Sequence, residues 1–475
     1  MKRSFALFAI IALAVMALLT SSCAGDRTLE KASATITAGE LRDYTRILGA
    51  DSMMGRKPFT PGEDITIKYL AGELAKLGFE PAFGDSWYQE VPMVEITTVV
   101  DGKVLITCGG NSMELAAPDD IAVESPSMRQ YVELEEIPMV FCGFGIVAPE
   151  YGWDDFAGLD VKGKCAVVLV NDPGLYTGDS TLFKGKEMTY YGRWTYKYEE
   201  AARQGAAAIL IIHETTGAGY DYSIPRNSSL SPGLYMETAK DGLEPCPVTG
   251  WLNAEAASRL FNMLGHDVES LQKNACQPGY KGFETEASMS LKLNNSHTRN
   301  NSFNVAGIHR GTTRPEECVI LSAHWDHFGI GEKENGDSIY NGAVDNGTSM
   351  AWAFEIGEAF ASMKKRPERS VIIFFPTAEE QGLLGSTWFA THPPVEVQNI
   401  IAAFNNDLLL PIGRMKDIMV TGYGQSELDD LLADAARHQD RYIMPDPHPE
   451  TGMYFRSDHF PFARVGIPSL FARGN

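Results

Sequence analysis

From Asn304 onward, near-continuous apolar segments alternate with segments of helical periodicity. The runs CVILSAH, SVIIFFP and IIAAFNND have the character of buried strands, whereas TSMAWAFEIGEAFASMKK, GLLGSTWFATH and SELDDLLADAARH have that of helices. Thr348 or Ser349 is a suitable cap for the first of these helices. Apolar strands alternating with helices are typical of a sheet covered on both faces. We therefore expect an α/β fold with a mixed, mostly parallel sheet.

Residues with metal-binding side chains follow each of these strands. They are His324 and Asp326 after the first strand, Asp345 in the loop NGAVDNGTS, Glu379 and Glu380 after the second strand, and Asp407 after the third. Open α/β sheets bind ligands at the carboxyl ends of their strands. The sequence therefore predicts that these side chains converge on one site.

The residue types at this site favour a divalent metal. One imidazole among several carboxylates is a donor set that suits zinc. Asp345 is the candidate for bridging two metal ions, because its glycine-containing flanks let the backbone approach closely. Of the adjacent Glu379 and Glu380, one can bind metal while the other acts on water. Carboxylates in contact repel one another without a cation, which also favours a metal.

Each residue has a simpler structural interpretation. His324 can be a hydrogen-bonded structural histidine, Asp345 a turn residue before Asn-Gly, and the Glu379–Glu380 pair the acidic first turn of a helix. Taken singly, these interpretations are the better ones. They do not explain why consecutive strand ends all carry metal-type ligands, and the joint pattern therefore favours a site.

The sequence before Asn304 contains segments of two kinds, one with helical periodicity and one with short apolar runs. Helical patterns at Ala38–Leu48 and Ile65–Leu77, the second closed by Gly78, lie in the segment 39–125, which we assign to the same domain as 291–475. Between them, residues 126–290 contain short apolar runs such as KCAVVLVND and AAAILIIHE with one helical stretch, YKYEEAARQGA. This pattern predicts an inserted, β-rich domain.

The N-terminus has the features of an export signal. Lys2 and Arg3 precede the apolar run Phe5–Leu19, which is too short for a permanent membrane span, and small residues lead to Cys23. This pattern resembles a bacterial lipoprotein signal, with cleavage after residue 22, lipid on Cys23 and a tether over 23–38. An ordinary secretory signal is the alternative. Either predicts export, with the lipid implying a place on the cell envelope.

Charge and cysteine content exclude other classes. With 40 Lys+Arg against 62 Asp+Glu, the formal charge of −22 disfavours binding to nucleic acid phosphates. Beyond Cys23, six cysteines are scattered without a CxxC pair, so zinc-finger and thioredoxin-type sites are excluded. Disulfides and buried free thiols both remain open. Oligomeric state is not indicated by the sequence.

The motifs SAHWDH, NGAVDNGTS, TAEEQGLLGS, FNND and YFRSDHFPFARVGIP together resemble the M28 family of co-catalytic zinc peptidases, and the insert resembles a protease-associated (PA) domain. The resemblance implies that His324 and Asp407 hold one zinc, that Glu380 holds a second and that Asp345 bridges them. It also implies Glu379 as general base and a cis Asp345–Asn346 peptide. Asp326 would hydrogen-bond His324 and fix its tautomer. His327 has no ligand role in that pattern and is expected to be a packing or rim residue.

One ligand of the family pattern is not found. Family members carry a further histidine in a Tyr-His motif after the GIPSLF strand, and the present sequence ends at Asn475 before such a motif. His459 is the nearest, weak substitute. We therefore expect a zinc exopeptidase acting on peptides, most simply an aminopeptidase, with one or two zinc ions. Carboxypeptidase action, glutaminyl cyclisation with a single zinc, and a non-catalytic peptide-binding lipoprotein remain the alternatives.

Overall fold

The computed structural model describes residues 30–237 and 242–474, and the chain divides into two compact units. Unit 1 comprises the chain up to Glu90, Ser302–Met444 and the chain from Ser457 onward, and unit 2 comprises Val91–Asn301 and Pro445–Arg456. The second unit is thus wider than the predicted insert of 126–290 and takes in a short late segment. The predicted signal and Cys23 lie outside the described residues. None of the helices in the described ranges has the length and apolarity that a membrane crossing requires.

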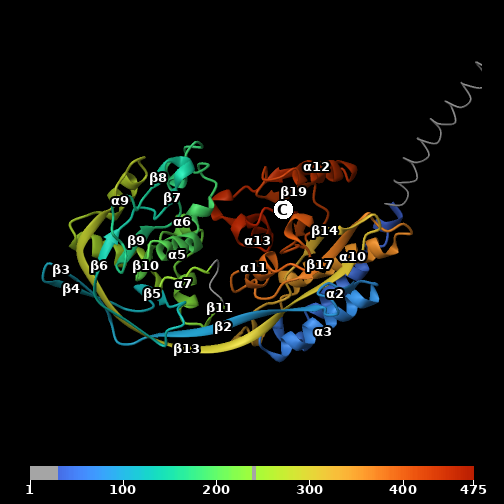
Figure 1. Ribbon diagram of the computed structural model, residues 1–475, viewed down its shortest axis with the longest axis horizontal. Helices are drawn as coiled ribbons and strands as arrows, with labels where there is room; N and C mark the ends of the chain where they lie inside the picture. The colour runs from blue at the N-terminus through green and yellow to red at the C-terminus, as the bar shows by residue number, and fades with distance from the viewer. Residues whose placement is uncertain (1–29, 238–241, 475) are drawn as a thin grey trace, which may run out of the picture. The chain divides into compact units, whose positions relative to one another are not determined.

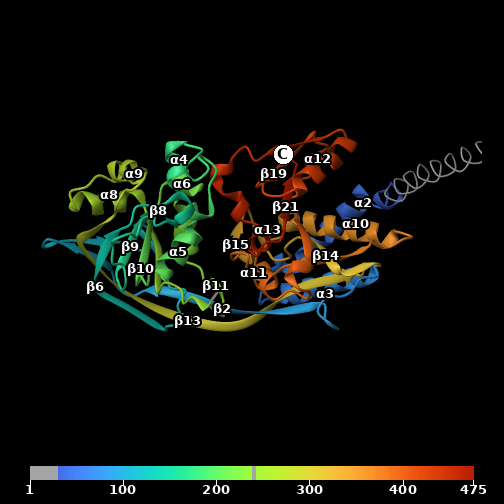
Figure 2. The same cartoon turned by 45° about the horizontal axis from the view of Figure 1, so that its top comes forward.

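Unit 1 is built on a mostly parallel sheet, as the sequence predicted (Figures 1 and 2). Strand β14 (Arg314–Ser322) lies between β17 (Arg369–Phe375) and β18 (Ile400–Asn405) and pairs in parallel with both. Strand β21 (Ser469–Arg473) adds in parallel beside β18. Antiparallel pairings flank this group, through β1 (Glu80–Pro81), the end of β13 (Phe283–His309) and β19 (Asp417–Thr421). Strand β20 (Tyr442–Pro445) pairs with β19.

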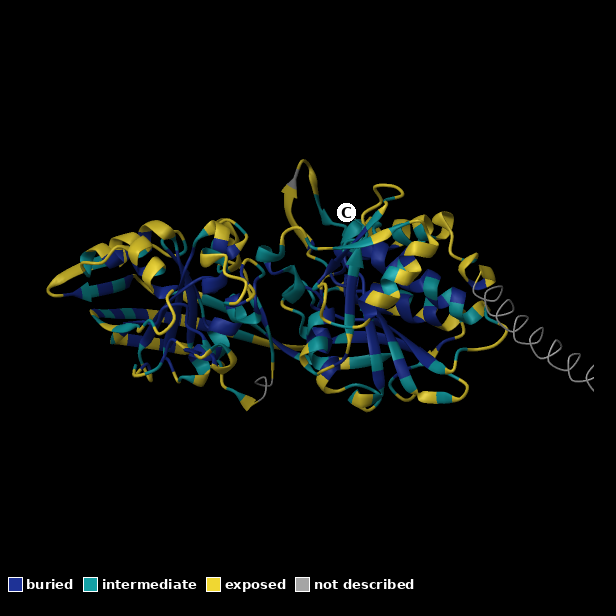
Figure 3. Ribbon diagram, turned by 90° about the horizontal axis from the view of Figure 1, so that it is seen from above, coloured by how far each residue is buried: buried dark blue, intermediate teal, exposed yellow. Residues whose placement is uncertain are grey.

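Helices cover both faces of this sheet because alternate strand residues point to opposite sides. Ile373 and Phe375 pack in one cluster with α2 (Ala38–Leu48), α3 (Pro61–Lys76) and α10 (Thr348–Ser362). Ile372 and Phe374 pack in another with α11 (Leu384–Thr391) and α13 (His459–Arg464). Helix α12 (Leu428–His438) packs on β19 and β21 through Leu428 and Leu432. The strands therefore run through the most buried part of the unit (Figure 3).

The helix bounds follow local signals with one exception. Helix α2 has the predicted bounds, with the Thr37 side chain accepting a hydrogen bond from the Glu40 N–H, and Thr60 caps α3 in the same way. The predicted cap of α10 is wrong. Gly347 is the N-cap, and the Thr348 hydroxyl donates to the Val344 carbonyl at 2.8 Å. Gly347 itself has helical φ and ψ angles of −57° and −39°, so Thr348 is the first residue of the helix rather than its cap.

Unit 2 contains a second, smaller parallel sheet. Strand β9 (Cys165–Leu169) pairs in parallel with β6 (Tyr131–Phe141) and β10 (Ala208–Ile212), and β10 pairs in parallel with β12 (Val248–Leu252). The predicted helix is α5 (Trp194–Arg203). Further elements are β3 (Val104–Cys108), β4 (Asn111–Leu115), β5 (Ile121–Glu124), β11 (Gly233–Met236), α8 (Ala254–Met263) and α9 (Val268–Ala275).

Two features of unit 2 were not expected. The chain enters and leaves it within two long strands, β2 (Tyr88–Val100) and β13, which pair with each other. The late segment Pro445–Arg456 joins the unit through contacts such as the Met188 N–H donating to the Pro449 carbonyl at 3.1 Å. The six cysteines of the described chain are buried and free, so the buried-thiol interpretation is the correct one.

Candidate metal centre

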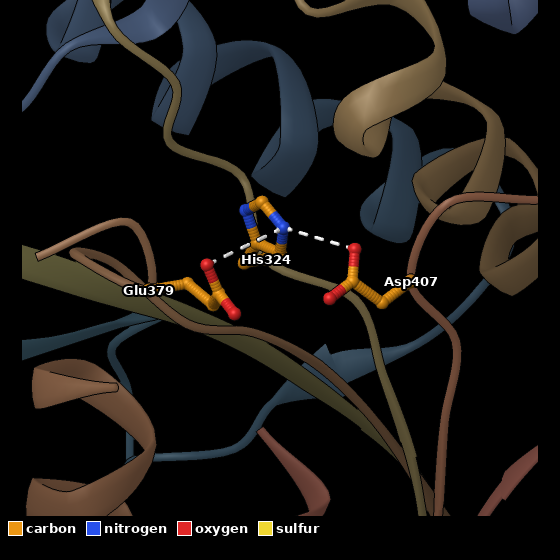
Figure 4. A group of neighbouring side chains, drawn as sticks. All are labelled: His324, Glu379 and Asp407. Atoms are coloured by element: carbon orange, nitrogen blue, oxygen red, sulfur yellow. Dashed lines mark ion pairs between the residues drawn. The ribbon is translucent and has the colours of Figure 1, made fainter. Parts of the chain in front are cut away.

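The six predicted site residues lie together at the carboxyl ends of the parallel strands of unit 1. His324 and Asp326 follow β14, Glu379 and Glu380 follow β17, and Asp407 follows β18. Figure 4 shows the side chains of His324, Glu379 and Asp407 reaching toward one another from three separate loops. The fourth loop, between β16 (Asp337–Tyr340) and α10, contributes Asp345. The expected convergence is therefore present.

Two carboxylates lie within ligand spacing of the His324 imidazole. Its Nε2 is 3.1 Å from Asp345 Oδ1 and 3.4 Å from Asp407 Oδ1, and 3.9 Å from Glu379 Oε2. Two donor atoms bound to one tetrahedral zinc at about 2.0–2.1 Å would lie roughly 3.4 Å apart. The spacing of His324, Asp345 and Asp407 thus suits a single shared ion, with Glu379 the most distant of the three carboxylates.

A second group of donors also includes Asp345. The ligand atoms of His327, Asp345 and Glu380 lie within 4.8 Å of one another, and His327 Nε2 is 3.8 Å from Glu380 Oε1. The His327 Nδ1 lies 2.9 Å from the Tyr340 carbonyl oxygen, a distance at which an Nδ1–H donates to it. That bond leaves Nε2 with its lone pair facing Glu380. His327 is the one donor that the sequence reasoning had assigned to packing or to the rim.

Asp326 is close to His324 but does not make the predicted hydrogen bond. Its carboxylate oxygen Oδ1 is 3.7 Å from His324 Nδ1, whereas its own backbone carbonyl lies 3.1 Å from that nitrogen. The carboxylate instead accepts the backbone N–H groups of Glu379 at 3.0 Å and Glu380 at 3.3 Å. Two backbone donors compete successfully for the same oxygens. Asp326 therefore orients the glutamate pair with its side chain and the histidine with its main chain.

Two residues that the sequence analysis did not assign to the site support it. Ser457 donates its hydroxyl to Asp407 Oδ2 at 2.8 Å and accepts from the Asn405 side-chain amide at 2.7 Å. The fully buried Arg56 donates to backbone carbonyls of the surrounding loops. Its acceptors are Leu48, Trp325, Asn341, Gly342 and Asp345. Arg56 lies in the motif LGADSMMGRKPFTPGED, and this motif was the one feature of the sequence that could have indicated a role for Arg56.

The peptide Asp345–Asn346 is cis, as the family resemblance implied. Asn346 is fully buried, and its side-chain amide donates to the Asn406 carbonyl at 3.2 Å. This contact ties the Asp345 loop to the loop that carries Asp407.

The pKa values at the site reflect burial and crowding of like charges. Burial raises the pKa of Glu379 well above its usual range, with Asp407 acting in the same direction. Burial likewise raises the pKa of Glu380 to about 8. Burial alone would lower the pKa of His324, but the charges of Glu379, Asp345 and Asp407 hold it well above its usual range. One imidazolium does not neutralise this many carboxylates, so the charged form of the site requires more cation.

The unpaired oxygens point to the same need. Asp345 Oδ1, Glu380 Oε1 and Asp407 Oδ1 are buried atoms that accept no hydrogen bond of good geometry from the described residues, although His324 Nε2 lies 3.1 Å from the first and 3.4 Å from the last. Buried carboxylate oxygens are normally satisfied. Together with the two imidazoles, they form the donor set of a zinc-type centre. The residues present therefore fit a metal ion.

His459, the weak substitute for the missing ligand, does not join either group of donors. It is fully buried in α13, and its ring centroid lies 5.2 Å from that of Phe471. His327 is thus the nearer histidine to the Asp345–Glu380 pair among the described residues.

Comparison with known proteins gives a consistent family. Residues 304–475 match the family model described as Peptidase family M28. The chain is 25% identical to human carboxypeptidase Q over 217 residues, which cover 45% of this chain and 38% of that protein. It is 30% identical to the rat protein named Aminopeptidase NAALADL1 over 233 residues, covering 40% of this chain and 30% of that one. Each alignment spans less than half the length of the curated relative.

A solved structure shares the fold over most of the chain. The aminopeptidase from Aneurinibacillus sp. strain AM-1 superposes with a TM-score of 0.51 at 16% identity, covering 94% of this chain and 87% of that one. At this identity the likeness concerns the fold alone.

Proposed function

The chain carries a peptidase family M28 domain over residues 304–475, and on this premise we propose that it is a zinc-dependent exopeptidase of the aminopeptidase type. The observation that carries the proposal is the pair of donor groups that meet at Asp345. His324 and Asp407 form one group with Asp345, and His327 and Glu380 form a second group with it. This arrangement suits two metal ions that share one bridging carboxylate.

The metal ligands follow from which atoms are unused. His324, Asp345 and Asp407 would hold one ion, and Asp345, Glu380 and His327 the other. Asp407 can offer Oδ1 because Ser457 already occupies its Oδ2. His327 can offer Nε2 because Tyr340 occupies its Nδ1. Zinc bound there would supply a Lewis acid that polarises a peptide carbonyl and lowers the pKa of a coordinated water.

Glu379 is suited to move protons. Of the carboxylates around His324 Nε2 it lies farthest from that atom, at 3.9 Å, and its backbone N–H is fixed by Asp326 at 3.0 Å. In the proposed reaction Glu379 accepts a proton from the attacking water and delivers it to the nitrogen of the departing amine. The adjacent Glu380 stays a ligand, which matches the division of labour expected for this pair.

A peptide panel tests the proposal. The purified zinc-loaded protein is incubated with Leu-Gly-Gly, its N-acetylated form and its C-terminally amidated form. We expect hydrolysis of the free and amidated peptides with release of leucine, no hydrolysis of the N-acetylated peptide, and loss of activity after chelation that zinc restores. Cleavage of the acetylated but not of the amidated peptide would replace the aminopeptidase assignment with carboxypeptidase action. Failure of every peptide with zinc bound would reject the exopeptidase proposal.

A further inference from the structure

The two arginines Arg193 and Arg456 lie close to each other inside unit 2. Arg193 immediately precedes helix α5, and Arg456 ends the late segment Pro445–Arg456. A Cβ placed on Gly452 of that segment would lie 3.4 Å from Arg193 Cδ, so the Arg193 side chain packs directly against the segment. The charge of Arg456 acts on Arg193, and the charges of both arginines act on Tyr220. The two cations thus share one small region of unit 2.

Arg193 is buried without an acceptor. Only 7% of the residue is exposed, and neither a hydrogen bond nor an ion pair links its guanidinium to any residue of the described chain. Burial lowers the pKa of Arg193 to about 10, so it stays charged at neutral pH. A buried charge without a partner is strongly unfavourable. An ordinary structural arginine would not be placed in this way.

Arg456 has nearly as few hydrogen-bond acceptors as Arg193. Its Nη2 donates to the Ala218 carbonyl at a long 3.4 Å, and its guanidinium carbon lies 5.4 Å from the centroid of the Tyr220 ring. Its Nε is buried and without a hydrogen-bond acceptor in the described residues. Two cations therefore stand together although the sequence contains 62 acidic residues.

The other buried cations of the described chain show what satisfied sites look like. Arg56 donates five hydrogen bonds to backbone carbonyls. Lys197 donates to the Asn171 carbonyl at 2.8 Å and is flanked by the charges of Asp155 and Asp172. Arg193 is the exception among these three, which indicates that its acceptor comes from outside the chain.

We propose that Arg193 and Arg456 form an anion site in unit 2 that binds a carboxylate, namely the C-terminal carboxylate of a short peptide. Guanidinium groups bind planar carboxylates through paired N–H donors, and a second guanidinium adds charge at the same point. The aromatic rings nearby, Tyr220 and the contacting pair Tyr190 and Phe455, exclude water and strengthen such a bond. The choice of a peptide as the source of the carboxylate rests on the proposed function.

Equilibrium binding to the full zinc-loaded chain tests the site without requiring hydrolysis. The probes are N-acetylglycine, N-acetylglycinamide and inorganic phosphate, measured by calorimetry. We expect the acid to bind at least tenfold more tightly than the amide. Arg193→Gln and Arg456→Gln should each weaken binding of the acid by tenfold or more, whereas Arg129→Gln, at an exposed position of the same unit, should leave it unchanged. Any acid binding that remains in the Arg193→Gln/Arg456→Gln double variant belongs to the metal centre.

Several outcomes overturn the proposal. The carboxylate site would be rejected if the acid and the amide bound equally tightly, or if the acid did not bind. It would also be rejected if Arg193→Gln and Arg456→Gln bound the acid as tightly as the wild type does. Phosphate binding as tight as that of the acid would reject the carboxylate assignment. Arg193→Lys, which keeps the charge, guards against a folding defect and should retain more binding than Arg193→Gln. Hydrolysis of the amidated Leu-Gly-Gly should persist in all these variants, so failure of the peptidase proposal would be seen separately.

Discussion

At the scale of single residues, the metal centre depends on which atom of each ligand is already engaged. Ser457 holds one oxygen of Asp407 and Tyr340 holds one nitrogen of His327, so that each residue presents its other atom to the site. Asp326 holds the main chain of the glutamate pair rather than the ring of His324. These second contacts set the direction of every donor, which is what a metal ligand set requires.

The division between Glu379 and Glu380 predicts different consequences of the same substitution. Glu379→Gln should lower kcat by about 10²- to 10⁴-fold while zinc content stays unchanged, because the variant loses a proton acceptor and no ligand. Glu380→Gln should instead lower zinc content. Steady-state kinetics combined with metal analysis distinguish the two variants. A fully active Glu379→Gln enzyme would show that Glu379 is not the base.

A second residue-scale prediction concerns Glu63, which is 5% exposed at the start of α3. Burial raises its pKa to about 7, despite hydrogen bonds from the Phe59 N–H and the Ser302 hydroxyl. The folded state therefore binds more protons than the unfolded state between about pH 4.5 and pH 7. This residue's contribution to stability is complete below that window and decreases as pH rises through it, by on the order of 3 kcal/mol.

Glu63→Gln should flatten that pH dependence. The free energy of unfolding from urea titrations at several pH values between 4.5 and 8 provides the measurement. Asp85→Asn, at an exposed position of the same unit, is the control and should keep the wild-type slope. An unchanged slope in Glu63→Gln would mean that the carboxyl titrates normally in the folded protein.

The candidate ligand residues could be predicted from the sequence because they follow segments with the recognisable apolar pattern of strands. His324, Asp345, Glu380 and Asp407 all fall at strand ends or in the glycine-containing loop, and the structure brings them together. The position of the His327 side chain could not be predicted from the sequence, since it depends on the turn that follows β14 and on the Tyr340 carbonyl. The hydrogen bonds from the Glu379 and Glu380 N–H groups to the Asp326 carboxylate could not be predicted either, because every residue type except proline has a backbone N–H.

At the scale of elements, Arg56 joins pieces that are far apart in the sequence. Its guanidinium connects the end of α2 through Leu48, the loop after β14 through Trp325 and the Asp345 loop through Asn341. A single side chain thus fixes the loop that carries Asp345. Buried carbonyl groups otherwise require separate donors.

Replacing this residue should therefore destabilise the site and the unit together. Arg56→Met should reduce the free energy of unfolding by roughly 3 kcal/mol or more, because several buried carbonyls lose their donor. It should also weaken zinc binding. Arg46→Met, at an exposed position of α2, should change stability by less than about 0.5 kcal/mol. Denaturant unfolding would reveal a wild-type-like Arg56→Met protein if the hydrogen bonds were dispensable.

Elements defined by a strong local pattern were predictable, whereas those defined by distant pairing were not. Helix α2 and the strands β14, β17 and β18 match their apolar patterns. The long strands β2 and β13 carry mixed residues and are defined by pairing with several distant strands, since β13 pairs with β1, β2, β3, β6 and β17. The segment Pro445–Arg456 joins unit 2 through tertiary contacts alone, and its local sequence does not predict these contacts.

At the scale of the whole molecule, the chain combines a unit containing the segment that matches peptidase family M28 with a second unit that has its own core. The buried apolar cluster around β9, β10 and β12 is formed by residues of unit 2, and the cluster around β14 and β17 by residues of unit 1. The proposed zinc ligands come together only in the folded unit 1, so zinc binding should add to the stability of the folded chain by mass action.

That linkage predicts a dependence of thermal unfolding on zinc. Raising free zinc to about a thousandfold above its dissociation constant should add about 4 kcal/mol per site to the free energy of unfolding. Differential scanning calorimetry of the chelated and the zinc-loaded protein would show the shift. The chelated Glu379→Gln variant should respond to zinc as the wild type does, because it retains every ligand. Absence of any shift would argue against a native-state zinc site.

The most direct measurement is the number of zinc ions bound per chain, determined by titration against a chromophoric chelator. The account predicts two in the wild type, one in His327→Ala and two in His438→Ala, an exposed histidine on α12. Two ions in His327→Ala would contradict the assignment of the second ligand set. No zinc in the wild-type chain would contradict the metal centre and with it the proposed peptidase.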